Sequence, residues 1–327
     1  MTQLRVIKLL NRHGDSVRLL NLGARLCSLQ LRLRSGPRNV VLGYPDVNDY
    51  IDEPNFMGCT VGRFGNRIAH ASFDIDGKQY RLSGNDGKHH LHGGADGFDR
   101  RLWAVTDSEG GNSVTFELES PHGDQGYPGN LRATARYDWN DDRQLTITYC
   151  AETDAETHVN LTSHAYFNLD GDSRDIRQHT VRVASDRIVA VDADMIPVGI
   201  LLNLYGSVLD FRQPTCLAHA IVSDNAMINA AGGIDFSYVL NVVDVVATAW
   251  SHNRDLRMSL QTSCPALHLY TGQNLVHPMH RFAGFCMEPQ YFPDTPNHKE
   301  FPESLLKPGE RFRANTRYRF VEEAIGE

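Results

Sequence analysis

Apolar and polar residues alternate along several segments of the chain. Val114, Phe116 and Leu118 are separated by polar residues. The same period of two recurs in three further segments, 131–137, 145–149 and 312–320. Because successive side chains of a strand point to opposite faces, this pattern predicts half-buried antiparallel strands. The polar face of the last segment is rich in arginine, which we expect to be solvated rather than to form an anion site: Arg311, Arg313, Arg317 and Arg319.

Turn signals fit the same architecture. Asp76-Gly77 lies between short strands expected at 73–75 and 78–80, and this dipeptide is preferred in two-residue hairpin turns. Helical periodicity is weak, and the stretch 213–229 could hold a short helix or a loop. No repeat, low-complexity tract or linker marks a domain boundary. The pattern therefore predicts one all-β domain, 1–327, built from two or more packed sheets.

Composition and charge narrow the class of protein. The 327 residues are 41% hydrophobic and 22% charged, as in ordinary globular proteins, and the formal net charge is −8. No basic stripe is present, so nucleic-acid binding has little support. We interpret the acidity as a solubility feature rather than as a signal for a partner.

Cysteine usage and the N-terminal residues indicate a compartment. Six cysteines are scattered without a CxxC pair, which favours free thiols in a reducing compartment. The first ten residues are interrupted by charge and lack the apolar core of a signal peptide. No apolar run approaches the roughly 18 residues that a membrane span needs. We therefore expect a cytoplasmic, soluble protein with no membrane partner.

The residues that carry chemistry lie in five short segments, three of which contain glycine. These segments are Gly62–Ile68, Leu91–Gly94, Thr162–Asn168, Gly232–Asp235 and Cys286–Gln290. Together they supply two arginines, two histidines and two carboxylates. Histidine and a carboxylate can exchange protons near neutral pH, so this set suits general acid–base chemistry on a polyhydroxylated substrate. Segments this far apart can form one site only if a single fold brings them together.

Two of the segments hold candidate acid–base residues. Glu288 lies in an otherwise apolar strand, where its charge must be solvated or paired. An edge strand or a salt bridge would explain this glutamate equally well. His164 shares an expected strand face with Thr162 and Tyr166. A lone histidine is more often a structural residue than a catalyst, but this polar trio indicates a lined pocket.

The other segments have structural explanations beside the functional ones. The run His89-His90-Leu91-His92 suggests a metal, but a zinc site needs three or four ligands and no second cluster accompanies it, so we expect none. Asn66 and Arg67 end a glycine-rich segment without the spacing of a phosphate loop, and the arginine could simply brace a turn. Asp235 could likewise be a turn residue.

The five segments and their order resemble the aldose 1-epimerase (galactose mutarotase) family, from about Gly58 to about Phe312. The tail extends the resemblance through Phe292-Pro293-Asp294-Thr295-Pro296-Asn297, Phe301-Pro302 and Leu306–Glu310. The resemblance implies a large single-domain twisted antiparallel β-sandwich, the galactose mutarotase-like supersandwich. It also implies an isomerase that uses no cofactor and no metal.

The resemblance assigns roles to individual residues. It makes Glu288 the catalytic base and His164 the general acid. It implies further residues that bind the substrate: Asn66, Arg67, His92, Tyr166 and Asp235. Many relatives carry glutamine where this chain has His268, which we also place among the substrate-binding residues. If His268 touches substrate, hydroxyl preference or pH dependence would differ from those relatives. Phe64-Gly65 replaces the more usual Tyr-Ala, a change that we expect to be tolerated.

The implied reaction interconverts the α and β anomers of an aldohexose such as galactose or glucose. Glu288 removes the proton of the C1 hydroxyl while protonated His164 donates to the ring oxygen, so the C1–O5 bond opens. Rotation about C1–C2 and closure by the same pair give the other anomer. We expect Arg67 and His92 to help keep Glu288 ionised.

Other functions remain open from the sequence. A hexose-phosphate 1-epimerase would need further cations, for which Arg100 and Arg101 are candidates. A carbohydrate-binding sensor would have the pocket without turnover. A glycoside hydrolase is a third alternative, because two carboxylates are available. In each case we expect a small sugar as the ligand, and a protein that is a monomer or a homodimer.

Overall fold

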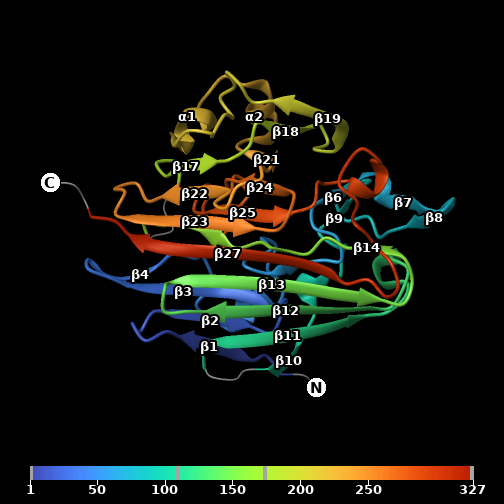
Figure 1. Ribbon diagram of the computed structural model, residues 1–327, viewed down its shortest axis with the longest axis horizontal. Helices are drawn as coiled ribbons and strands as arrows, with labels where there is room; N and C mark the ends of the chain where they lie inside the picture. The colour runs from blue at the N-terminus through green and yellow to red at the C-terminus, as the bar shows by residue number, and fades with distance from the viewer. Residues whose placement is uncertain (1–2, 108–110, 172–174, 325–327) are drawn as a thin grey trace.

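The computed structural model describes residues 3–107, 111–171 and 175–324, and its largest element is a nine-stranded antiparallel sheet. In spatial order its strands are β10 (Ala104–Asp107), β11 (Ser113–Ser120), β12 (Leu131–Trp139), β13 (Gln144–Thr153), β27 (Phe312–Glu322), β23 (Leu256–Thr262), β22 (Ala247–Trp250), β17 (Thr180–Val183) and β20 (Thr215–Cys216). The last strand, β27, therefore lies inside the sheet, between β13 and β23 (Figure 1).

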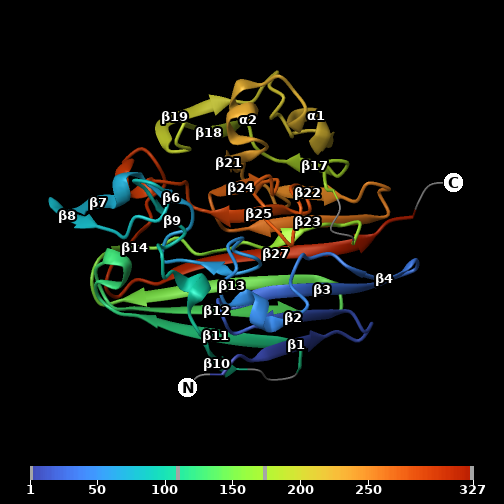
Figure 2. The same cartoon turned by 180° about the vertical axis from the view of Figure 1, so that it is seen from behind.

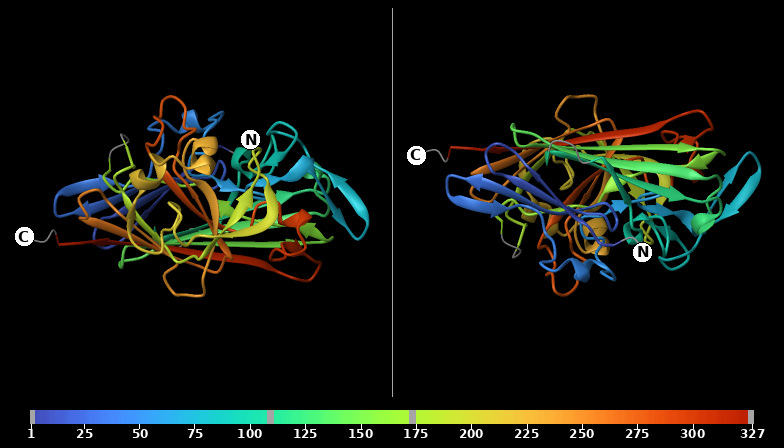
Figure 3. Two further views of the ribbon diagram at one scale, coloured as in Figure 1. Left: turned by 90° about the horizontal axis from the view of Figure 1, so that it is seen from above. Right: turned by 90° about the horizontal axis from the view of Figure 1, so that it is seen from below.

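Two further sheets complete the main framework. A four-stranded sheet consists of β1 (Val6–Leu10), β2 (Ser16–Leu20), β3 (Arg25–Leu33) and β4 (Gly36–Asn39). A six-stranded sheet has the order β16 (Tyr166–Phe167), β25 (Phe285–Gln290), β24 (Ala266–Tyr270), β21 (Asp235–Val239), β18 (Arg187–Val191) and β19 (Pro197–Asn203). End-on views separate β1–β4, in blue, from β11–β13, in green, as two inclined layers (Figure 3).

Short elements connect these sheets. Four two-stranded ladders pair β5 (Thr60–Val61) with β15 (Thr162–Ser163), β6 (Arg67–Ile68) with β9 (His90–Leu91), β7 (Ser72–Ile75) with β8 (Lys78–Arg81), and β14 (Thr157–His158) with β26 (Leu305–Leu306). The helices α1 (Leu217–Ile221) and α2 (Ala226–Ala231) lie at the end of the molecule beside β18 and β19 (Figure 2). Single 3-10 turns span Val47–Tyr50, Ala69–Ala71, Phe98–Arg100, Asp124–Gly126 and Thr295–Asn297.

One cluster of buried apolar side chains joins the three large sheets. It takes Val17 from β2, Phe116 from β11 and Met287 from β25. Burial of apolar surface between facing sheets is the main driving force for such a sandwich. The all-β sandwich expected from the sequence is therefore confirmed.

The local predictions are confirmed as well. The alternating segments form β11, β12, β13 and β27, and the arginines at 311, 313, 317 and 319 are exposed. Asp76 and Gly77 have positive φ values of 51° and 79°, as a two-residue hairpin turn between β7 and β8 requires. The stretch 213–229 holds α1 and the beginning of α2.

Candidate active site

A cavity of about 170 Å³ lies against the six-stranded sheet and brings the predicted site residues together. All eight of them line it: Asn66, Arg67, His92, His164, Tyr166, Asp235, His268 and Glu288. The first three lie in or next to β6 and β9, and His164 and Tyr166 lie just before and at the start of β16. The last three lie on β21, β24 and β25. The assembly of distant segments into one place is as the sequence predicted.

Strand register explains why these side chains converge. Ser237, His268 and Glu288 lie directly opposite one another on β21, β24 and β25. Residues that lie directly opposite one another on antiparallel strands project to the same face of the sheet. Their neighbours along each strand project to the other face. Met287 and Leu267 accordingly enter the main core, while Glu288 and His268 face the cavity. The sheet thus forms one wall of the site.

Glu288 is the most deeply buried carboxyl group of the cavity, with a relative exposure of 1%. Its Oε1 lies 3.8 Å from His164 Nε2, and its Oε2 has no hydrogen-bond partner among the described residues. Burial raises the pKa of Glu288 well above its ordinary value, and the charge of Asp235 raises it further. Burial of the carboxyl group therefore favours its protonated form.

The expectation that Arg67 and His92 keep Glu288 ionised is wrong. The Arg67 guanidinium donates from Nε to Asp86 Oδ2 at 2.8 Å, so a different carboxylate compensates its charge. Burial lowers the pKa of His92 well below its ordinary value, which leaves this ring neutral. Neither residue is a cause of the pKa shift of Glu288. The residues that line the cavity could be identified from the sequence, but the pairing of their charges could not.

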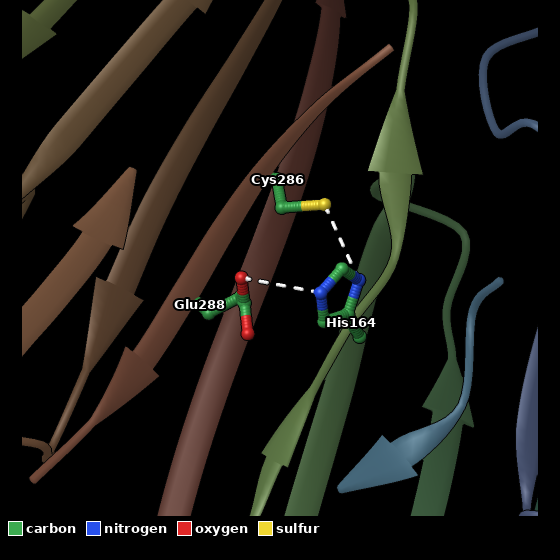
Figure 4. Close-up of side chains that lie close together, drawn as sticks. All are labelled: His164, Cys286 and Glu288. Atoms are coloured by element: carbon green, nitrogen blue, oxygen red, sulfur yellow. Dashed lines mark hydrogen bonds and ion pairs between the residues drawn. The ribbon is translucent and has the colours of Figure 1, made fainter. Parts of the chain in front are cut away.

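His164 lies between Glu288 and a thiol (Figure 4). Its Nδ1 is 3.6 Å from Cys286 Sγ, on the side of the ring opposite the contact with Glu288. Burial lowers the pKa of His164 to about 4. Burial therefore favours the uncharged form of both groups, the carboxylic acid of Glu288 and the neutral ring of His164.

A close backbone approach positions His92. Gly93 has φ of 89°, and a Cβ there would lie 1.7 Å from the carbonyl oxygen of Gly62, so only glycine fits. His92 Nδ1 accepts a hydrogen bond of 3.2 Å from the backbone N–H of Asn66. Because the neutral ring carries its proton on the other nitrogen, His92 Nε2 is a donor.

Asp235 provides an acceptor on β21. Its Oδ1 lies 2.7 Å from His268 Nε2. Burial by itself raises the pKa of Asp235, but the hydrogen bond from His268, together with the nearby charge of Arg67, outweighs it, so the pKa is lowered overall. Asp235 is therefore ionised where Glu288 is not, and the two carboxyl groups of the cavity differ in protonation.

Sequence reasoning missed the loop that closes one side of the cavity. Pro54, Asn55 and Phe56 line it, and the Phe56 ring lies 4.8 Å from the His92 ring and 5.9 Å from the His164 ring, centroid to centroid. A buried ion pair, Glu53 with Arg25, holds the loop. Glu53 also accepts from the backbone N–H groups of residues 55 and 57, each at 2.8 Å.

Three further lining residues were missed: Leu91, Tyr270 and Asn274. Alternation could have identified Tyr270, since it shares a strand face with His268. Leu91 lies beside His92 in one of the five segments. Asn274 lies in a loop, and its backbone N–H donates to the Tyr270 hydroxyl at 3.0 Å.

The residues offered for other chemistry lie elsewhere. His90 bonds Tyr127 and the Ser83 carbonyl, at 2.8 and 2.6 Å, and does not line the cavity. Arg101 pairs with Asp96 and Asp124, at 2.9 and 2.8 Å. Among the described residues, one group of three side chains offers ligand atoms close enough together for a metal ion: His164, Cys286 and Glu288, whose ligand atoms all lie within 4.8 Å of one another.

An all-β sandwich with a buried carboxyl–imidazole pair in a polar cavity is suited to acid–base catalysis. The family model for aldose 1-epimerase matches residues 5–319. The aldose 1-epimerase of Escherichia coli K12 is 36% identical over 98% of this chain and 96% of its own length. The galactose mutarotase of Rattus norvegicus is 35% identical over 93% and 91%.

Solved structures agree with these sequence matches. The GalM/aldose epimerase homologue from C. elegans has a TM-score of 0.92 and 29% identity, and covers 98% of this chain and 100% of its own. Galactose 1-epimerase from Lactobacillus acidophilus has a TM-score of 0.88 and 28% identity, over 99% and 100%. The chain therefore belongs to the aldose 1-epimerase family, and it is an isomerase.

Two general features complete the description. All six cysteines lie in the described part of the chain and are free thiols. Among the described residues, no helix has both the length and the apolar character needed to cross a bilayer.

Proposed function

We propose that this protein is a mutarotase that opens and recloses the ring of an aldohexose such as galactose or glucose, with Glu288 and His164 as its acid–base pair. The observation that carries the proposal is the facing of these two groups, 3.8 Å apart, in a cavity that otherwise offers hydrogen-bonding side chains. Proton transfer and bond rotation are the only steps required, and two titratable groups of opposite protonation are sufficient for both transfers.

The single proton of the pair accounts for both halves of the reaction. For ring opening, carboxylate Glu288 takes the C1 hydroxyl proton, and protonated His164 donates to the ring oxygen. Opening leaves a proton on Glu288 and a neutral His164. This is also the distribution of protons that burial of the two groups favours. The pocket is therefore matched to the open-chain aldehyde, and bound sugar must shift the proton toward His164 before opening.

The remaining residues hold the sugar. His92 Nε2 donates a hydrogen bond, and the free oxygen of Asp235 accepts one from a hydroxyl. Asn66 and Arg67, at the start of β6, contribute further polar groups. The Tyr166 hydroxyl donates to the Asn55 carbonyl at 3.0 Å, so this residue offers its ring to the sugar rather than its hydrogen. Residues 1–327 act as one domain, because the pocket draws on segments from 54 to 288.

Polarimetry of freshly dissolved α-D-glucose and α-D-galactose tests the proposal. We expect the protein to speed relaxation to an unchanged final rotation, and Glu288→Gln to abolish most of this acceleration. Relaxation at the buffer rate for both sugars would reject mutarotation of free hexoses. Binding of sugar without acceleration would instead indicate a carbohydrate sensor.

The phosphorylated-sugar alternative is not favoured. The cations suggested for it are paired elsewhere: Arg101 with Asp96 and Asp124, and Arg100 within 4 Å of Asp99 and Asp52. Arg67, the arginine that lines the cavity, is paired with Asp86. Competition between glucose and glucose 6-phosphate in the polarimetric assay separates the two substrates. We expect glucose 6-phosphate to compete poorly.

A further inference from the structure

Three side chains form a hydrogen-bonded chain across β21 and β24. The Ser237 hydroxyl lies 2.9 Å from His268 Nδ1, and His268 Nε2 lies 2.7 Å from Asp235 Oδ1. The strand register produces this order, because Ser237 lies directly opposite His268 and Asp235 is two residues before Ser237 on the same face. Both ring nitrogens of His268 are thus engaged within the protein.

The direction of each hydrogen bond follows from the donors available. An ionised Asp235 can only accept, so His268 Nε2 carries a hydrogen. Ser237 is 3% exposed, and His268 Nδ1 is the hydrogen-bond partner of its hydroxyl among the described residues. A buried hydroxyl hydrogen needs an acceptor, and Nδ1 supplies one only in the neutral ring. Ser237 therefore donates to His268, which donates to Asp235.

We infer that Ser237 and His268 are positioning residues that fix which oxygen of Asp235 receives the substrate. The inference rests on the proposed function, because it assigns a sugar hydroxyl to Asp235. His268 takes one lone pair of Oδ1 and holds the carboxylate in place, and Oδ2 is the oxygen that has no hydrogen-bond partner among the described residues. Asp235 therefore offers the substrate an acceptor, whereas both ring nitrogens of His268 are already engaged within the protein.

This arrangement has a consequence for substrate choice. A single acceptor strengthens the binding of a sugar whose hydroxyl donates a hydrogen bond to it. A sugar that lacks this hydroxyl gains no binding energy from the acceptor. His268 acts on the substrate through Asp235, rather than by direct contact as its place among the binding residues had suggested. A glutamine at 268 could repeat the chain, because its carbonyl can accept from Ser237 and its amide can donate to Asp235.

The test compares aldohexoses with their deoxy analogues by polarimetry. The hydroxyl bound by Asp235 is identified first, as the one whose removal raises KM in the wild type but not in Asp235→Asn. For Ser237→Ala we expect KM for the parent sugar to rise about 2- to 10-fold, the loss of one buried hydrogen bond. We expect KM for the matching deoxy sugar, and kcat for both, to stay unchanged. His268→Gln should retain the selectivity, and His268→Leu should lose it.

Ser185→Ala is the matched control. Ser185 is a fully buried serine whose hydroxyl bonds the Val239 carbonyl at 2.6 Å, on the neighbouring strand and away from His268. The control should leave the ratio of the two KM values unchanged. Equal effects of Ser237→Ala on the parent and deoxy sugars, or the same change in Ser185→Ala, would overturn the positioning role.

A second measurement does not depend on turnover. Nitrogen-15 NMR of the sugar-free protein at neutral pH should show His268 with a hydrogen on Nε2 and none on Nδ1. A ring protonated on both nitrogens would overturn the inference, even if mutarotation is observed. If the wild type lacks mutarotation, the proposed function fails, while the NMR result still decides whether the hydrogen-bonded chain has this direction.

Discussion

The buried carboxyl group of Glu288, which we propose for catalysis, lowers the stability of the folded protein. Burial raises the pKa of this carboxyl group above its ordinary value of 4.5. Between pH 4.5 and the raised pKa, the folded protein keeps a proton that the unfolded chain releases. The free energy of unfolding therefore falls by about 1.4 kcal/mol per pH unit in that window. Glu288→Gln keeps the size of the side chain and removes the ionisation.

We expect the variant to be as stable as the wild type below pH 4.5 and more stable above it. The difference should grow by about 1.4 kcal/mol for each pH unit until the raised pKa is reached. Turnover should fall by ~10²–10⁴-fold, the usual contribution of one acid–base group. A more stable but inactive variant would show that the wild-type residue is retained for chemistry and not for folding.

Urea unfolding at a series of pH values from 4 to about 8, followed by intrinsic fluorescence, measures the stability difference. Polarimetry on the same preparations measures turnover. Glu119→Gln is the control, because Glu119 is exposed on β11 and lies outside the cavity, so its substitution should not reproduce the stability gain of Glu288→Gln. Parallel pH dependences of the wild type and Glu288→Gln would refute the reasoning, as would near-normal turnover.

Four other predictions follow from the same site. Asp235→Asn should raise KM about 10-fold or more, since it removes a charged acceptor, and an unchanged KM for every aldose tested would contradict this. Phe56→Ala should lower kcat/KM about 2- to 10-fold through lost ring contacts with the histidines, whereas Phe56→Leu should retain more activity. Glu53→Gln should lower the free energy of unfolding by about 3–5 kcal/mol in urea titrations, because it leaves Arg25 buried without its partner. The kcat/KM profile should fall on the acid side near pH 4, where His164, whose burial lowers its pKa to about 4, takes up a second proton, and a flat profile through that range would count against the pair.

The fold could be predicted because its signal is local. Alternation identified β11, β12, β13 and β27, since each has one face against the core and the other in solvent. The strands that carry the site gave a weaker signal. All six residues of β25 are buried, so alternation of polarity cannot mark its two faces. Resemblance to a family, rather than periodicity, located Glu288.

The electrostatics of the site could not be predicted from neighbouring residues. Arg67 lines the same cavity as Glu288, but its guanidinium is paired with Asp86, and only the fold reveals that pairing. Phe56 was missed for a similar reason. It lies in an irregular loop held by Glu53 and Arg25, and an ion pair between residues 28 positions apart has no periodic signature.

The central place of β27 has a consequence for how the protein is made. This strand is the last in chain order, yet it pairs with both β13 and β23. While a ribosome is still translating the chain, each of those strands exposes an unpaired edge until residues 312–322 emerge. Exposed edges of this kind recruit other strands, so the nascent chain is vulnerable to aggregation until β27 has been translated. The largest sheet therefore closes only after translation of its final strand, and chaperones have the greatest opportunity to act in that interval.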